Sequence, residues 1–262
     1  MAKPPSRGAS IKHRPAAEVL FVKTTEKPHS MKTFRLDARL CAAAEFARKG
    51  RIAADIGTDH AMLPITLVKK GIAPRAVASD INKGPLERAG INIAASGLSD
   101  RITTVLTDGL TGLEDSGAED IFILGMGGEL ISRIVRASGL PSKAGVRLIM
   151  QPMTHAADLR RDLLAGGFRI TDESLCTDSG RIYQTVCAEY DGEKREWTPV
   201  ELVLGKHNIA RGGVLLQKQA CYLAGVYTTR AEGLEKSGKS ADAERALVRE
   251  LKAISHNSRL TP

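Results

Sequence analysis

The sequence predicts a doubly wound α/β fold, in which a mostly parallel sheet is covered by helices on both faces. Short apolar runs, of the right length for buried strands, alternate with helical stretches from residue 36 to residue 165. Two strand-like runs joined by a turn then follow, which predicts a hairpin that closes the sheet. Apolar residues at helical spacing after residue 215 predict a coiled-coil-like helical hairpin.

The individual elements follow from the same patterns. A first helix is expected from Leu36, with an apolar face that includes Leu40 and Ala43, and an end at Gly50, as a C-cap glycine would give. Strands are expected at 52–56, 76–81, 102–107, 120–125 and 147–151, with helices at 61–70, 84–97, 128–138 and 155–165. The closing hairpin is expected at 168–176 and 181–190, and the helical hairpin at 216–234 and 247–254.

Composition divides the chain into three parts. Residues 1–30 are rich in Lys, Pro and Ser and show no structural period, so we expect a disordered basic arm there. Residues 31–195 are expected to form the main α/β domain and residues 196–262 a helical C-terminal domain. Met31 offers an alternative start of translation.

The overall composition is that of an ordinary folded protein. Hydrophobic residues make up 42% and charged residues 26% of the 262 residues. No apolar run is long enough for a membrane span and no secretory signal is evident, so we expect a cytoplasmic protein. The four cysteines show no metal-ligand spacing, so no metal site is expected. The oligomeric state stays open, with a monomer favoured.

The net charge of +8 points to nucleic acid, because Lys and Arg neutralise phosphates. Six of these charges lie in residues 1–35, so the arm is either a solvated tail or a phosphate contact. Other candidate phosphate contacts are Lys32, Arg35, Arg39, Lys206, Arg211 and Lys218.

Candidate chemistry gathers at the ends of the first four predicted strands, where ligands bind in open α/β sheets. The ends carry Asp55-Ile56-Gly57-Thr58-Asp59-His60, Asp80, Asp108-Gly109 and Gly125-Met126-Gly127-Gly128. Asp80 follows Gly57 by 23 residues, a spacing at which a carboxylate can accept hydrogen bonds from both ribose hydroxyls of a nucleoside cofactor. The glycine pattern of dinucleotide sites is missing, and Asp55 and Asp59 would repel phosphate. The pattern favours S-adenosylmethionine, which carries an ammonium and a sulfonium.

These motifs resemble those of one family. The segments DIGTDHAMLP (55–64), SDINKGP (79–85), TDGL (107–110), GMGG (125–128) and QPMTHAADLR (151–160) are similar, in this order, to the TrmK-type tRNA adenine-N1-methyltransferases, which modify adenine 22 of tRNA. The resemblance covers roughly residues 35–190, and the helical C-terminal segment matches in kind. Asp80 departs from the pattern, because Glu is common at this position, and the basic arm is additional.

The resemblance implies a class I, Rossmann-like methyltransferase that uses S-adenosylmethionine and acts on tRNA. Asp59 and His60 would face the target adenine as candidate catalytic residues. The cofactor would be bound by Asp55, Gly57, Asp80, Ile81, Asp108 and Gly109. From its position at a strand end, Gly125 is a further candidate contact of the cofactor, and Met126, Gly127, Gly128 and His155 are candidate contacts of the target base.

Alternatives remain open from the residues alone. Asp59 could instead be the N-cap of the helix that starts near Ala61, and His155 could serve in capping. The chain could methylate another RNA or a small molecule, or be a non-catalytic nucleic-acid-binding relative. An NAD-dependent dehydrogenase is disfavoured by the missing glycine pattern.

Overall fold

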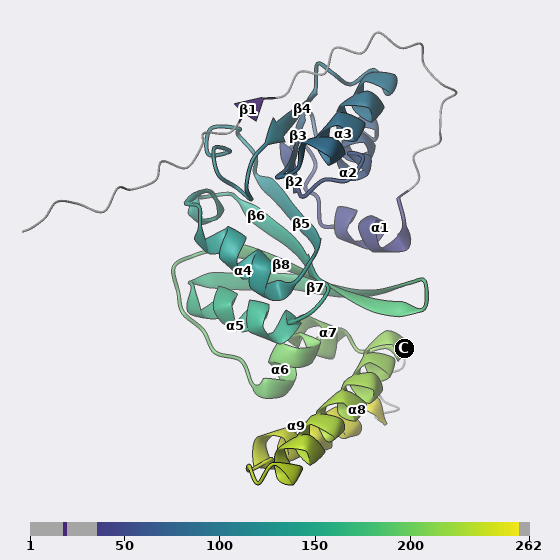
Figure 1. Ribbon diagram of the computed structural model, residues 1–262, viewed down its shortest axis with the longest axis vertical. Coiled ribbons are helices and arrows are strands. Elements are labelled where there is room, and N and C mark those ends of the chain that lie inside the picture. The colour runs from purple at the N-terminus through teal and green to yellow at the C-terminus, as the bar shows by residue number, and fades with distance from the viewer. Residues whose placement is uncertain (1–17, 20–35, 257–262) are drawn as a thin grey trace, which may run out of the picture.

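The computed structural model describes residues 18–19 and 36–256, which include an eight-stranded mixed sheet (Figure 1). Its strand order is β1-β4-β3-β2-β5-β6-β8-β7. Strands β2 to β6 pair in parallel, whereas β1, β8 and β7 are antiparallel to their neighbours. The predicted doubly wound α/β fold and its closing hairpin are therefore confirmed. The strands are β1 (Glu18–Val19), β2 (Ala53–Ile56), β3 (Ala76–Asp80), β4 (Ile102–Leu106), β5 (Asp120–Met126), β6 (Arg147–Pro152), β7 (Phe168–Asp178) and β8 (Arg181–Tyr190).

Helices cover both faces of the sheet. One buried apolar cluster joins the sheet to α1 (Ala38–Ala44), α2 (Met62–Lys69) and α3 (Lys83–Ala95). A second cluster, on the other face, joins it to α4 (Gly128–Arg136), the 3₁₀ turn η1 (Leu140–Ser142) and α5 (Ala156–Ala165). The central strands read as continuous apolar runs because both faces are covered in this way.

The first helix is shorter than the sequence predicts. Helix α1 ends at Ala44 rather than running to Gly50. Beyond it, the backbone N–H of Arg48 donates to Asp120 Oδ2 at 2.6 Å, and its guanidinium donates to Asp120 Oδ1 at 2.7 Å. Asp120 is 1% exposed and needs these partners. A contact 72 residues away therefore draws the chain out of the helix.

The C-terminal part is helical, as predicted, and begins earlier than the apolar stripes suggest. Helices α6 (Pro199–Leu204) and α7 (Lys206–Arg211) precede α8 (Val214–Lys236) and α9 (Asp242–Ser255). The sequence analysis missed α6, although Thr198 and Glu201 form a capping box at its start. Helices α8 and α9 pack side by side as a hairpin (Figure 1), around a separate apolar cluster that includes Leu216 and Leu251.

A buried charged network links this helical part to the sheet. The Arg160 guanidinium donates to Glu173 Oε1 at 2.6 Å and to Gln184 Oε1 at 2.6 Å. It also donates to the carbonyl oxygen of Leu202 in α6 at 2.8 Å, and the other Glu173 oxygen accepts from the backbone N–H of His207. Arg160 and Glu173 are fully buried. Because each buried charge has partners, the network fixes α6 and α7 against α5 and the β7–β8 hairpin.

The predicted arm over 1–30 lies outside the described residues, apart from the two residues of β1. The boundaries at residues 31 and 196 stay a prediction. Among the described residues, no helix combines the length and apolarity needed to cross a bilayer.

Candidate active site

The candidate site lies at the carboxyl ends of β2, β3, β4 and β5. The chain leaves β2 toward β3 and β4 on one side, and later returns to β5 and β6 on the other, so the strand order reverses at β2. Ligands bind at such a reversal in open α/β sheets. The strand pairing places Asp55 and Asp80 on adjacent strands, with Asp108 and Gly125 at the same edge. The sequence prediction that these residues gather at one edge is confirmed.

Asp55 is a half-buried carboxylate at the end of β2. Burial raises its pKa to about 6, and the negative charge of Asp80 adds to this. A hydrogen bond from Thr58 Oγ1 to Asp55 Oδ2 at 2.7 Å and the positive charge of Arg39 act in the opposite direction on the pKa. The group is therefore poised to gain from a cationic ligand, which would favour its ionised form.

Gly57 makes the tight turn that leaves β2. Its φ is +74°, in the left-handed region that favours glycine, and the N–H groups of Gly57 and Thr58 both donate to the Ser79 carbonyl oxygen at 2.8 Å. The terminal methyl of Met126 lies where a Cβ at Gly57 would be. The turn is therefore covered by a flexible side chain that can rotate away when a ligand approaches the backbone.

The ends of β3 and β4 present a mixed polar and apolar surface. Asp80 Oδ1 accepts from the backbone N–H of Asn82 at 2.6 Å, which fixes the carboxylate. Ile81 is 62% exposed, an unusual state for a large apolar side chain, and Asp108 is exposed. At Gly109, where φ is +61°, a Cβ would lie 3.1 Å from the Ile134 side chain. A planar base over Ile81 and hydroxyls on Asp80 fit this surface.

The loop Asp59-His60-Ala61 is strained. His60 and Ala61 both have left-handed backbone, with φ of +61° and +53°. The Asn92 side chain on α3 donates to the His60 carbonyl oxygen at 3.0 Å, and Asp59 Oδ1 lies 3.3 Å from His60 Nε2 and 3.5 Å from Arg88. The helix N-cap is Ala61, without a side-chain cap, so the alternative that Asp59 caps α2 is wrong.

The glycine loop 125–128 packs on the loop that precedes α5. The Gly128 N–H donates to the Thr154 carbonyl oxygen at 2.9 Å, and a Cβ at Gly128 would overlap the backbone of His155. His155 is the N-cap of α5 but makes no side-chain cap bond. Its Nδ1 lies 3.1 Å from Asp158 and 3.6 Å from Glu129. Its ring therefore faces the acidic groups of α4 and α5, and a contact with the target base stays a prediction.

Two residues near the site were not among the predicted cofactor contacts. The Arg39 guanidinium, from α1, donates to Gln151 Oε1 at 2.8 Å, and its Nη1 lies 3.5 Å from the Cβ position of Gly125. Gln151, at the end of β6, is fully buried. The sequence analysis placed Arg39 among possible phosphate contacts. It did not place Arg39 at the strand ends, because only the folded chain brings α1 there. Gln151 opens the segment 151–160, which was the available signal.

The donor set fits S-adenosylmethionine better than a metal or a dinucleotide. Asp80 suits ribose hydroxyls and Asp55 an ammonium, while Gly57 leaves its backbone open to a close approach. Within residues 18–19 and 36–256, no three His, Cys, Asp or Glu side chains are grouped to hold a metal ion.

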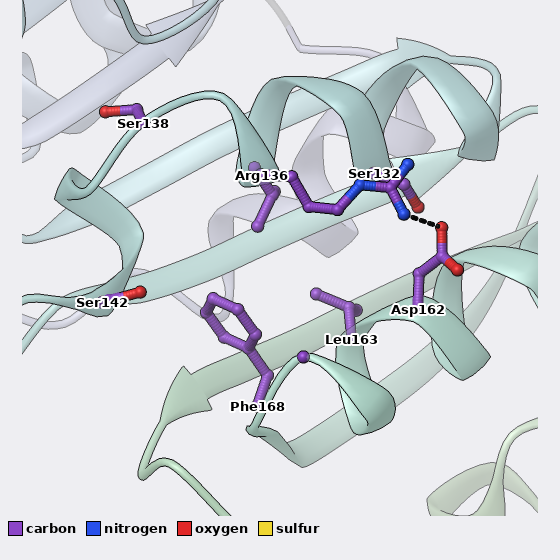
Figure 2. Close-up of a pocket in the computed structure, with 9 residues that line it drawn as sticks. Ser132, Arg136, Ser138, Ser142, Asp162, Leu163 and Phe168 are labelled. Carbon is purple, nitrogen blue, oxygen red and sulfur yellow. Dashed lines mark hydrogen bonds and ion pairs between the residues drawn. The ribbon is translucent and has the colours of Figure 1, made fainter. Parts of the chain in front are cut away.

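Two cavities lie away from these strand ends. One, of about 360 Å³, lies between the C-terminal halves of α4 and α5, where Arg136 and Asp162 pair at 2.9 Å (Figure 2). The other, of about 610 Å³, lies between α1, β7 and the Gly212-Gly213 link.

Comparison with known proteins agrees with this geometry. A family model described as a methyltransferase domain matches residues 36–186. The chain is 34% identical to the tRNA (adenine(22)-N(1))-methyltransferase of Bacillus subtilis over 67% of this chain and 74% of that protein. It is also similar to the crystal structure of the B. subtilis M1A22 tRNA methyltransferase TrmK, at 27% identity and a TM-score of 0.71, covering 85% and 96% of the two chains.

A third relative was solved with a bound cofactor. A Streptococcus pneumoniae protein, with a provisional assignment as a tRNA (m1A22) methyltransferase, forms a complex with S-adenosyl-L-methionine. The match has 30% identity and a TM-score of 0.73, and covers 83% of this chain and 98% of that one. Strand ends rich in Asp and Gly, the strand order and these matches agree: the chain belongs to the family of the tRNA (adenine(22)-N(1))-methyltransferases.

Proposed function

We propose that this protein transfers a methyl group from S-adenosylmethionine to N1 of adenine 22 in tRNA. The observation that carries the proposal is the row of four neighbouring strand ends that bears Asp55, Asp80, Asp108 and Gly125 beside the strained Asp59-His60 loop. The methyltransferase family of the chain supplies the reaction class.

The cofactor is held by the residues at these ends. S-adenosylmethionine, when bound, supplies an electrophilic methyl group on its sulfonium. Asp80 accepts hydrogen bonds from the ribose hydroxyls, and Ile81 offers apolar contact to the adenine ring. Asp55 pairs with the ammonium of the methionine part, and Asp108, Gly109 and Gly125 line the remaining wall.

Positioning contributes most to this reaction. Adenine N1 has an in-plane lone pair, so methyl transfer requires an in-line approach more than a strong base. The new N1–C bond forms as the S–C bond breaks, and the adenine ring becomes cationic. Asp59, at the mouth of the site, stabilises this charge and can accept a proton from the N6 amino group. His60 lies beside it as a further contact for the base.

The target base must enter unpaired, because N1 is hydrogen-bonded in a duplex. Met126, Gly127 and Gly128 are our candidate contacts for the base, on a loop whose two glycines let the backbone pack closely on Thr154 and His155. His155 borders the same loop. The protein binds tRNA mainly through phosphates, because aromatic residues make up only 4% of the sequence.

The helical hairpin is our candidate docking arm for tRNA. Lys218 on α8 and Arg249 on α9 are exposed. Arg211 is a weaker candidate, since it pairs with Asp172 at 2.7 Å, and so is Lys206, which lies 3.4 Å from Glu201. Lys218→Gln with Arg249→Gln should raise the KM for tRNA and reduce its salt dependence while cofactor affinity is unchanged. An unchanged KM would remove the hairpin from the tRNA surface.

The decisive experiment measures transfer of labelled methyl groups from S-adenosylmethionine to unmodified tRNA with A22. The same tRNA with G22 is the control. We expect label only with A22, recovered as N1-methyladenosine. Label at another position of the tRNA would contradict adenine 22 as the target. No label despite cofactor binding would indicate that the substrate is another RNA or a small molecule.

A substitution at Asp59 tests the proposed carboxylate role. Asp59→Asn keeps the shape of the side chain and removes its charge. We expect kcat to fall roughly 100-fold, the scale of a general acid–base contribution, while affinity for S-adenosylhomocysteine stays within about twofold. Glu87→Gln, on the exposed surface of α3, is the matched control. Full activity of Asp59→Asn would show that the carboxylate takes no part in the reaction.

A further inference from the structure

Arg88 on α3 is a cation in contact with the strained Asp59-His60 loop. Its Nη2 lies 3.5 Å from Asp59 Oδ1, and Asn92, one turn further along the same helix, donates to the His60 carbonyl oxygen at 3.0 Å. The Arg88 side chain is 50% exposed and that of Asp59 is 68% exposed. The ion pair is therefore weak, because water screens it, and the guanidinium is free to take a second partner.

The Arg88 guanidinium points toward the edge of the sheet that carries the candidate site. Helix α3 begins at Lys83, shortly after β3 ends at Asp80, so its first turn lies at that edge. Helical side chains lean toward the helix N-terminus, and Arg88 Nη1 lies 3.7 Å from the Cβ position of Gly84, one turn earlier. Because Gly84 is exposed and has no side chain, the guanidinium is open to a ligand on this side.

This edge is acidic and by itself repels RNA. Asp59 and Asp108 are exposed, and Asp80 is partly exposed. Under the proposed function, the tRNA brings adenine 22 to Asp59, and its backbone carries a negatively charged phosphate on each side of that nucleotide. A cation in contact with Asp59 offsets the repulsion at the point where the base enters.

We propose that Arg88 binds a phosphate next to the target adenine of the tRNA, an inference that rests on the proposed function. The guanidinium carries five N–H donors, and the long contact with Asp59 leaves most of them for a phosphate, which accepts two parallel hydrogen bonds from arginine. Arg88 thus holds the backbone of the target nucleotide and the Asp59 carboxylate together, which places the carboxylate at the base.

The surface around Arg88 suits a nucleotide better than a protein. Ile91 lies three residues after Arg88 on the same face of the helix and is 51% exposed, so it can contact a ribose or a base. No second large apolar side chain is exposed on α3, a helix that the structure describes in full, whereas the core of a protein interface is largely apolar. One cation beside one apolar side chain matches a phosphate with its attached sugar and base.

An uncharged linkage in the RNA tests the contact directly. Two synthetic tRNAs carry a methylphosphonate in place of the phosphate on the 5′ or the 3′ side of A22, and a third tRNA has all its phosphates. Methylation kinetics of the wild type, Arg88→Gln and Arg88→Lys are measured with each tRNA, from about 50 to 200 mM salt. Arg101→Gln is the matched control, because it removes an exposed arginine next to the amino end of β4, at the opposite edge of the sheet.

With the all-phosphate tRNA, Arg88→Gln should raise the KM about 5- to 10-fold and reduce its salt dependence by about one phosphate contact, whereas Arg101→Gln should change neither. Arg88→Lys should lose less, because the charge remains. With one of the two methylphosphonate tRNAs, the wild type and Arg88→Gln should have the same KM, because the partner of Arg88 is missing. Unchanged affinity for S-adenosylhomocysteine shows that each variant is folded.

Other results overturn the proposal. A fall in kcat of Arg88→Gln with a wild-type KM and salt dependence would make Arg88 a support of Asp59 without a phosphate contact. An equal rise in KM with all three tRNAs would exclude both phosphates that flank A22. Wild-type kinetics of Arg88→Gln would remove Arg88 from the tRNA surface. If the wild type methylated none of the tRNAs, the proposed function itself would fail, and this result differs from every pattern above.

Discussion

Replacing Arg160 by Met should strongly destabilise the protein. Arg160 and Glu173 are both fully buried, and Arg160 donates to Glu173 and Gln184 at 2.6 Å and to the Leu202 carbonyl oxygen at 2.8 Å. In Arg160→Met the Glu173 charge stays buried without its cation. Removing one partner of a buried ion pair costs about 3–5 kcal/mol in the free energy of unfolding.

A second variant separates the lost ion pair from lost packing. Arg160→Met combined with Glu173→Met removes both charges, and replacing a whole buried pair by apolar side chains is often close to neutral. Here Gln184 and the Leu202 carbonyl also lose a partner, which costs about 1–3 kcal/mol for each buried group left unsatisfied. The double variant should therefore be less stable than the wild type but more stable than Arg160→Met.

Urea unfolding followed by circular dichroism measures these differences from the midpoint and slope. Affinity for S-adenosylhomocysteine should stay near the wild-type value in both variants at low urea. The network lies between α5, the β7–β8 hairpin and α6 rather than at the carboxyl ends of β2 to β5. A loss below about 1 kcal/mol for Arg160→Met, or a double variant less stable than the single one, would refute the reasoning on the buried charge.

Three further predictions concern the site. Affinity for S-adenosylhomocysteine should fall as the pH is lowered through about 6, because Asp55 then gains a proton and no longer attracts the ammonium of the ligand. Calorimetry from pH 5 to 8 should show this change in the wild type and a flat profile in Asp55→Asn. Gly128→Ala should lower the unfolding midpoint far more than Gly139→Ala in thermal scans, since a Cβ at Gly128 meets backbone carbonyl groups and one at Gly139 meets nothing within 4 Å. Asn92→Ala removes the donor that holds the His60 carbonyl oxygen, so kcat should fall while cofactor affinity is kept; an unchanged kcat would show that the strained loop holds its shape without it.

Much of the sheet is predictable because its signals are local. The central strands are short apolar runs that end in Asp or Gly, and each is followed by a helical pattern. Their carboxyl ends had to meet at one edge once the strands were parallel, so Asp55, Asp80 and Asp108 were grouped correctly from spacing alone. Their roles as ligands of the cofactor stay predictions.

The errors occurred where contacts distant in sequence override local pattern. Helix α1 ends early because Asp120 takes the backbone N–H of Arg48. Asp59 does not cap α2, since the chain turns through two left-handed residues first, a conformation that sequence pattern does not predict for His and Ala. Helix α6 was missed because its six residues are too short to show a period.

The sequence alone determined the fold class, the family resemblance and the edge of the sheet that carries the candidate site, because periodicity and strand-end motifs are written in neighbouring residues. Only the tertiary structure decided that Arg39 stands beside Asp55 and Gly125, and that Arg160 lies buried against Glu173. Both arrangements join residues from separate elements, and the position of a charge in space follows from the packing of those elements. Burial then sets what that charge does, from the raised pKa of Asp55 to the cost of removing Arg160.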